Sequence, residues 1–231
     1  MAIRRPFFGN LLLVILALFL VSSWAQALEI LVPRLVEPCE SAYGWRTQGA
    51  NSGPLTAIST SPKVKKSGNS AWELTYDFLG GGNPINNCTY LNIGKSSLIP
   101  GTVQALKFWL YGDGSGHRLV FRLRDNSGQI LQYNGGYITW VGWKEVTLDL
   151  DKNLQTYWAG SNSGKPSFPV YLFAVLIESK SATFKGSGKI YLDDIYALTP
   201  VTEESSMECS AITKLGNIFT SNEKVALDRK S

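Results

Sequence analysis

The fold is decided by residues 119–133, LVFRLRDNSGQILQY. Leu119, Phe121 and Leu123 alternate there with a valine and two arginines, which is the period-two pattern of a strand with one buried face. The polar residues 125–128 tolerate the positive φ angles of a tight turn, and a second alternating run begins at Gln129. This stretch therefore predicts a β-hairpin.

The same alternation recurs on both sides of the hairpin, while convincing stretches of the helical period 3.6 are missing. Residues 170–177 are apolar on both faces, as expected for a central strand. Eight or so short strands separated by Gly, Asn, Ser and Pro turns predict an all-β, two-sheet sandwich, because each antiparallel sheet must bury one face. The jelly roll is the commonest sandwich of this size. Further strands are predicted at residues 71–78, 89–93, 106–111, 137–140, 143–150 and 189–198.

The two ends of the chain differ from this β-rich middle. Residues 1–27 combine Arg4 and Arg5 with an apolar run from Leu11 to Val21 and a small-residue cleavage site, which is typical of a secretory signal peptide. Eleven apolar residues fall short of the roughly 20 that span a bilayer, so we expect no membrane contact after cleavage. Residues 28–199 form the predicted sandwich. Residues 200–231 are a polar tail, either disordered or the truncated start of a further domain.

The composition excludes several classes of function. Charged residues make up 17% and aromatic residues 12% of the chain, which rules out disorder as the main state. The formal net charge of +4 becomes +2 without Arg4 and Arg5, so nucleic-acid binding has no electrostatic support. The single histidine, His117, excludes sites that need two or three imidazoles.

Export would make this a secreted protein, extracellular or periplasmic, in a space where cysteines can pair. The chain has three cysteines, an odd number. Cys39 and Cys88 could form a disulfide and leave Cys209 in the tail, or all three could be free thiols.

Catalysis finds little support in the residues. A serine or cysteine nucleophile would need His117 as its base, but His117 follows a glycine-rich turn with no nucleophile elbow nearby. Glycoside hydrolysis needs only two carboxylates across a cleft. Glu73, Glu145 and Glu178 lie on predicted strands without a catalytic spacing, so solvated strand faces explain them better. We therefore expect a protein that is not an enzyme.

Two adjacent carboxylates, Asp193 and Asp194, interrupt an apolar strand. Adjacent strand residues face opposite ways, so one carboxylate points toward the core or rim, where it needs a partner. A calcium ion bound by oxygen atoms would supply one, with Glu37 and Glu40 as possible co-ligands. Alternatively, one aspartate accepts backbone hydrogen bonds and the other is solvated.

Aromatic residues are more numerous than one sandwich core readily absorbs. Rings on a sheet surface stack on the apolar faces of sugars, while Arg, Asn and Gln bond the hydroxyl groups. Trp72, Trp143 and Phe108 are in phase with core residues and are predicted to be structural. The alternative is that most of the other rings also pack within the sandwich. The candidate ligand-binding residues are Trp109, Tyr111, Arg122, Arg124, Gln132, Tyr133 and Tyr137, with Tyr157 and Trp158 in a polar loop.

Four segments, in this order and spacing, resemble the galactose-binding-like jelly rolls, which include carbohydrate-binding modules of families 11, 30, 4 and 22 attached to secreted glycosidases. They are Lys107–Gly116, Leu123–Gly128, Trp140–Val146 and Tyr191–Ile195. The resemblance implies a structural calcium at Asp193, with Glu37 or Glu40 nearby, and a ligand face on one sheet whose residues it does not fix. Lys214–Leu227 is similar to the opening of the immunoglobulin-like domain that often follows such modules.

The expected function is therefore non-catalytic binding of a polysaccharide or oligosaccharide by a secreted module that assists an attached or associated glycosidase. One alternative is a structural or protein-interaction domain of a cell-surface assembly. A flat, apolar sheet face would favour that alternative, and a groove with mixed aromatic and polar groups would favour sugar binding. A glycosidase is the third and weakest interpretation.

Overall fold

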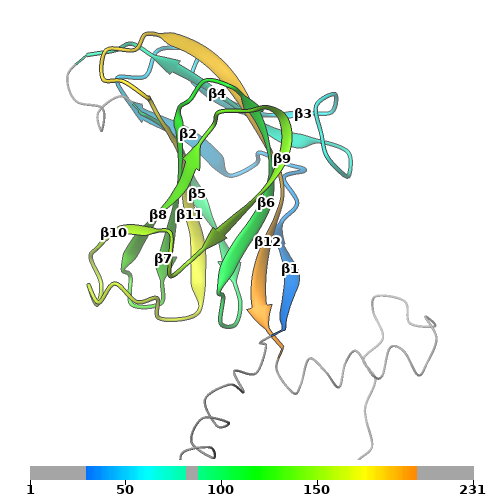
Figure 1. Ribbon diagram of the computed structural model, residues 1–231, viewed down its shortest axis with the longest axis vertical. Coiled ribbons are helices and arrows are strands. Elements are labelled where there is room, and N and C mark those ends of the chain that lie inside the picture. The colour runs from blue at the N-terminus through cyan, green and yellow to red at the C-terminus, as the bar shows by residue number, and fades with distance from the viewer. Residues whose placement is uncertain (1–29, 82–87, 202–231) are drawn as a thin grey trace, which may run out of the picture. The chain divides into compact units, whose positions relative to one another are not determined.

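The computed structural model describes residues 30–81 and 88–201, and these residues form twelve strands (Figure 1). No helix in this part of the chain is long and apolar enough to cross a membrane. The strands are β1 (Leu31–Glu37), β2 (Trp45–Ala50), β3 (Ala57–Ser61), β4 (Ala71–Phe78), β5 (Cys88–Ile99), β6 (Ala105–Asp113), β7 (Arg118–Asp125), β8 (Ile130–Tyr137), β9 (Val141–Asp149), β10 (Leu154–Trp158), β11 (Val170–Glu178) and β12 (Gly186–Pro200).

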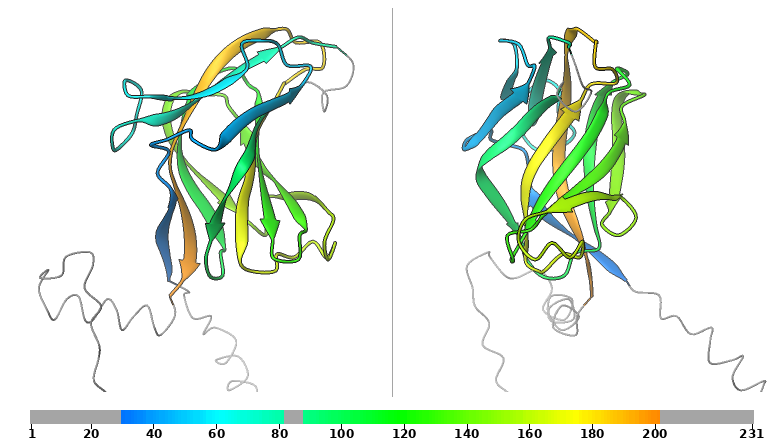
Figure 2. Two further views of the ribbon diagram at one scale, coloured as in Figure 1. Left: turned by 180° about the vertical axis from the view of Figure 1, so that it is seen from behind. Right: turned by 90° about the vertical axis from the view of Figure 1, so that its left-hand side faces the viewer.

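The strands form two antiparallel sheets of six strands each. Sheet A has the order β3-β4-β12-β6-β9, with β1 paired to β12, and sheet B has the order β10-β8-β7-β11-β5-β2. Strands that are neighbours in the sequence, such as β6 and β7, can belong to different sheets. Figure 2 shows the same ribbon in two further views. The predicted two-sheet jelly-roll sandwich is confirmed.

The hairpin that decided the prediction is formed by β7 and β8. The backbone N–H of Asp125 donates to the carbonyl oxygen of Gln129 (2.9 Å), and that of Gly128 donates to the carbonyl oxygen of Asp125 (3.0 Å). The carboxylate of Asp125 also accepts hydrogen bonds from Ser127 and Gln129, so it closes the turn from within. Leu123 then lies opposite Leu131, which aligns the apolar faces of both strands.

A single large core lies between the sheets. Trp72, Phe78, Phe108 and Phe121 are among its largest fully buried side chains. The structural roles predicted for Trp72 and Phe108 are confirmed. Trp143 is not in phase with the core as predicted: its ring is half-buried on sheet A and packs on Tyr111, 5.5 Å between ring centroids, because the inward positions of β9 are those of Val146 and Leu148.

Strand β11 lies between β7 and β5, so its prediction as a central strand is confirmed. Strand β10 contains Tyr157 and Trp158, which were predicted to lie in a polar loop. Residues 137–140 do not form a strand of their own, since Tyr137 ends β8. The predicted leader, residues 1–27, and the tail beyond Val201 lie outside the described residues, as does Cys209.

Candidate functional site

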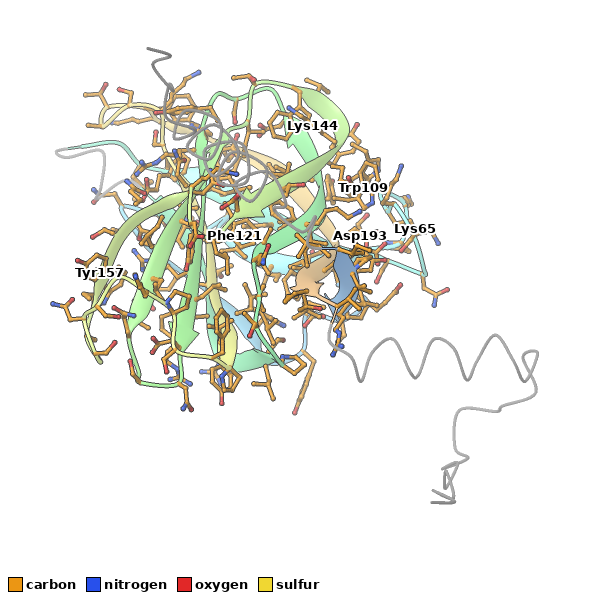
Figure 3. All side chains as sticks on the ribbon, turned by 60° about the horizontal axis from the view of Figure 1, so that its bottom comes forward. Lys65, Trp109, Phe121, Lys144, Tyr157 and Asp193 are labelled. Atoms are coloured by element: carbon orange, nitrogen blue, oxygen red, sulfur yellow. The ribbon has the colours of Figure 1, made fainter. Side chains whose placement is uncertain are left out.

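The predicted ligand-binding residues do not form one surface, because they come from strands of both sheets. Trp109 and Tyr111 belong to β6 of sheet A, whereas Arg122, Arg124 and Gln132 belong to β7 and β8 of sheet B. Figure 3 shows Trp109 and Tyr157 on opposite sides of the sandwich, with Phe121 between them. The molecule therefore has two separate outer faces that carry aromatic rings.

On the outer face of sheet B, Arg122 is held by two neighbours. Its guanidinium lies over the Trp158 ring, 5.1 Å from the ring centroid, and its Nε donates to Oε1 of Gln132 (2.8 Å). The Gln132 amide in turn donates to Oε1 of Gln155 on β10 (3.3 Å). Trp158 is 38% exposed, so one of its faces supports the arginine while part of the ring remains open to solvent.

A second arginine stacks farther along the same face. The guanidinium of Arg124 lies 5.6 Å from the ring centroid of Tyr171 and 5.8 Å from that of Phe173. Both rings belong to β11, and neither was among the residues predicted to bind ligand. The apolar character of β11 on both faces hid them, and the pairing of Tyr171 with Arg124 is known only from the register of the strands.

Farther along β7 and β11, the outer face of sheet B carries a packed patch of apolar side chains. Val120 and Leu176 are fully buried there and pack with Ala174. Beside them the guanidinium of Arg118 forms an ion pair with the carboxylate of Glu178, and both side chains are largely buried. This part of the face is structural, and the accessible part is the strip around Arg122, Arg124 and Trp158.

Tyr133 does not lie on this surface. It is fully buried in the core, on the same side of β8 as Leu131, so its prediction as a ligand contact is wrong. Tyr137 is 59% exposed at the end of β8, and Tyr157 is 42% exposed on β10. Both are accessible, and Trp158, next to Tyr157 on β10, contacts Arg122 directly.

The outer face of sheet A carries a second group of rings. Tyr111 packs edge-on between Trp143 and Tyr191, with centroid distances of 5.5 and 5.6 Å. The ammonium group of Lys66 lies 3.9 Å from the centroid of the Trp109 ring. These rings contact each other or the ammonium group of a lysine and are all half-buried, so they serve mainly to cover sheet A.

The carboxylates predicted to bind metal occupy different environments. Asp193 is fully buried, and its Oδ2 accepts hydrogen bonds from the backbone N–H groups of Lys66 (2.7 Å) and Ser67 (3.1 Å). Its Oδ1 has no hydrogen-bond partner in the described part of the chain. Burial raises the pKa of Asp193, and the two amide bonds lower it only in part.

The two glutamates are each engaged elsewhere. Glu37 accepts from the N–H of Cys39 and from the hydroxyl of Ser97, and Glu40 accepts from the N–H groups of the adjacent residues 69 and 70. Within residues 30–81 and 88–201, no three His, Cys, Asp or Glu side chains are placed to hold a metal ion. The three predicted ligands therefore do not converge on one point.

Cys39 is a free, buried thiol, so the Cys39–Cys88 disulfide considered from the sequence is not formed. Burial raises the pKa of its thiol, and the neighbouring carboxylates of Glu37 and Asp193 raise it further. A thiol of this kind remains protonated and packs as a small apolar group.

His117 is a core residue. Its Nδ1 accepts a hydrogen bond from the backbone N–H of Lys180 (3.0 Å), and the rings of Tyr76, Phe78 and Phe184 surround it at about 5 Å between centroids. Burial lowers the pKa of His117 to about 4. The Oγ of Ser115 accepts a hydrogen bond from the backbone N–H of His117 (3.3 Å), while the imidazole ring packs among these aromatic side chains.

Comparison with known proteins gives one family match. Residues 98–206, slightly less than half of the chain, are similar to the flagellar filament outer layer protein FlaA family. The match begins in β5 and includes every later strand of both sheets. No curated protein matches the sequence.

Several solved structures with a similar fold are carbohydrate-binding modules. A family 11 module from Clostridium thermocellum, in complex with a β-1,3-1,4-mixed-linked tetrasaccharide, has a TM-score of 0.50 and 14% identity over 75% of this chain and 99% of that chain. The family 11 module of a cellulosomal cellulase of the same organism has a TM-score of 0.48 and 15% identity, covering 74% and 96%. A carbohydrate-binding module of the β-sandwich superfamily has a TM-score of 0.48 and 13% identity over 76% of this chain, which spans only 64% of that longer chain. At these identities the likeness shows the fold alone: the chain has the jelly-roll β-sandwich that its sequence resembles.

Proposed function

We propose that this protein binds carbohydrate, without catalysis, on the outer face of sheet B. The observation that carries the proposal is the contact between Arg122 and Trp158, with Gln132 bonded to the same guanidinium. A partly exposed indole offers an apolar surface for a sugar ring, and the arginine and glutamine beside it offer fixed polar groups for the hydroxyls. This is the mixture of aromatic and polar groups expected of a sugar-binding face.

The carboxylates support binding without catalysis. On sheet A, Glu73 forms an ion pair with Lys189, and Glu145 forms one with Lys107. On sheet B, Glu178 forms an ion pair with Arg118. Strands β4 and β9 are separated by β12 and β6, so Glu73 and Glu145 are roughly 15 Å apart at about 4.8 Å per strand. That distance exceeds the 5 to 10 Å at which paired carboxylates act in glycosidases.

Affinity electrophoresis tests the proposal with gels that contain β-glucan, galactan, xylan or acidic polysaccharides. We expect retardation by at least one polysaccharide, its loss in Trp158→Ala, and its retention in Trp109→Ala, which removes an equal ring from sheet A. Circular dichroism establishes that both variants are folded. The proposal is wrong if no polysaccharide retards the protein, or if Trp109→Ala abolishes retardation while Trp158→Ala does not.

A second candidate function is that of a subunit in the outer layer of an extracellular filament. The family match over residues 98–206 favours it specifically. Sedimentation of purified flagellar filaments with and without the protein tests this candidate: co-sedimentation supports it, and a protein that stays in the supernatant at saturating filament contradicts it.

The structural calcium ion remains a proposal. The unpartnered Oδ1 of Asp193 favours it, while the engagement of Glu37 and Glu40 by hydrogen-bond donors disfavours them as co-ligands. A calcium ion bound only by the folded state would raise the melting temperature over that in chelator. Equal melting temperatures in millimolar calcium and in chelator would show that the folded protein does not bind a stabilising calcium ion. Secretion and association with a glycosidase are also proposals. N-terminal sequencing of the exported protein tests secretion, and co-purification tests association with a glycosidase.

A further inference from the structure

The strands of the two sheets carry opposite charge. The six strands of sheet B contain five basic residues and two acidic ones, whereas those of sheet A contain four basic and eight acidic residues. Sheet B therefore differs from sheet A in having a surplus of arginine and lysine.

Both acids of sheet B are engaged away from the accessible strip. Asp125 is 2% exposed, and its carboxylate accepts hydrogen bonds from Ser127, Gln129 and Ser167 in the turns beside it. Glu178 is paired with Arg118 beside the packed patch of β7 and β11. The strands of sheet B thus contain no further acid to balance the charges of Arg46, Arg122 and Arg124.

Three arginines share the outer face of sheet B. Arg46 is in register with Asn92, Asn92 with Ala174, and Ala174 with Arg122, which places Arg46 and Arg122 in one row across four strands. At about 4.8 Å per strand this row is roughly 14 Å long. Arg124 lies two residues along β7 from Arg122, on the same face, and both Arg46 and Arg124 are exposed.

Two of these guanidinium groups are supported by rings, Arg122 by Trp158 and Arg124 by Tyr171 and Phe173. A guanidinium stacked on a ring keeps its in-plane N–H donors directed sideways, in the fork that matches a carboxylate. Neutral sugars need only scattered donors and acceptors, but a row of guanidiniums without sheet acids is complementary to a chain of repeated negative charge.

We propose that the ligand of this face is an acidic polysaccharide whose uronate carboxylates bind the row of Arg46, Arg122 and Arg124. This inference rests on the proposed function, carbohydrate binding by sheet B, and adds the class of sugar. The surface of an acidic protein would offer the same charges, but the rings of Trp158, Tyr171 and Phe173 beside the arginines favour a ligand with sugar faces to stack.

The experiment compares polygalacturonate and alginate with their methyl-esterified forms, in which the same sugars carry no charge. We expect isothermal titration at low salt to show binding of at least one acidic polymer about tenfold tighter than its ester, with an affinity that falls as salt rises. Arg124→Gln and Arg46→Gln each weaken that binding roughly three- to tenfold. Arg34→Gln, the same change on β1 of sheet A, leaves it unchanged.

The outcomes separate this inference from the function on which it rests. Binding of the esters as tight as that of the acids, without salt dependence, overturns the acidic class and leaves carbohydrate binding in place. If no neutral or acidic polysaccharide binds, both the acidic class and carbohydrate binding are overturned. Polyglutamate that binds as tightly as polygalacturonate overturns the saccharide ligand in favour of an acidic protein. The ester comparison and the salt series use the unmodified protein, so they decide the matter even if a variant does not fold.

Discussion

Arg122 of β7 and Trp158 of β10 are joined across the intervening strand β8, with the guanidinium 5.1 Å from the centroid of the indole ring. Strand β10 is the edge of sheet B, and most of its residues are exposed. The contact therefore attaches an edge strand to the sheet and, by the same geometry, orients the arginine that we place in the binding strip.

The first prediction concerns the energy of this contact. A double-mutant cycle with Arg122→Ala and Trp158→Ala is expected to give a coupling of about 0.5 to 1 kcal/mol in the free energy of unfolding, because a cation over a partly exposed ring contributes about that much. Urea denaturation measures it. The same cycle with Arg46→Ala in place of Arg122→Ala should give a coupling near zero, and a coupling as large in that control would refute the specific contact.

The strands predicted from the sequence are those with at least one face in the core. Alternation of large apolar residues found β4, β7 and β12 because every second side chain is buried. Strands β1 and β10 are mostly exposed and lack this pattern, so nothing in their sequence distinguishes them from loops. The alternation also predicts which face of a strand is buried. Tyr133 is two residues from Leu131 on β8, so both side chains face the core.

The candidate site was predicted only in part because alternation does not say to which sheet a strand belongs. Trp109 and Arg122 are close in sequence and both point outward, yet the chain crosses between the sheets through the turn at residues 114–117. The pairing of β7 with β11 brings Tyr171 beside Arg124 from nearly fifty residues away, and only the register shows it.

A second prediction follows from the buried His117. Its folded-state pKa of about 4 lies below the unfolded value of about 6.5, so the neutral form is favoured by folding. The stability from this group is complete above about pH 6.5 and is lost as the pH falls toward 4, by up to about 3 kcal/mol. Urea midpoints at pH 7 and pH 4.5 measure the loss.

The control for this pH dependence is His117→Phe, which places a ring among Tyr76, Phe78 and Phe184. It removes the titrating group and should lose distinctly less stability between pH 7 and pH 4.5 than the unmodified protein. If both proteins lose the same amount, the acid sensitivity comes from carboxylates and His117 is not its source.

A third prediction concerns the loop that follows β10. Gly160 has φ +50°, and a Cβ atom there would overlap the backbone nitrogen of Gln129, the residue just before β8. Gly160→Ala should therefore lower the free energy of unfolding by about 2 kcal/mol or more, from backbone strain and displacement of the turn together. Gly128→Ala is the matched control, since its φ is +86° but nothing lies within 4 Å of the added methyl group. It should cost only the strain, about 1 kcal/mol; equal losses in the two variants would show that the overlap is relieved.

The last prediction compares two buried tyrosines. The hydroxyl of Tyr133 has no hydrogen-bond partner in the described structure, whereas that of Tyr76 donates to Oδ2 of Asp113 at 2.5 Å. Tyr133→Phe removes a buried polar atom that gains nothing from folding, so the stability should stay the same or rise by up to about 1 kcal/mol. Tyr76→Phe removes a hydrogen bond to a carboxylate and should cost about 1.5 to 3 kcal/mol. Urea denaturation of both variants gives the comparison. Tyr133→Phe should also leave polysaccharide binding unchanged, because this ring faces the core, and a loss of binding there would return Tyr133 to the candidate site.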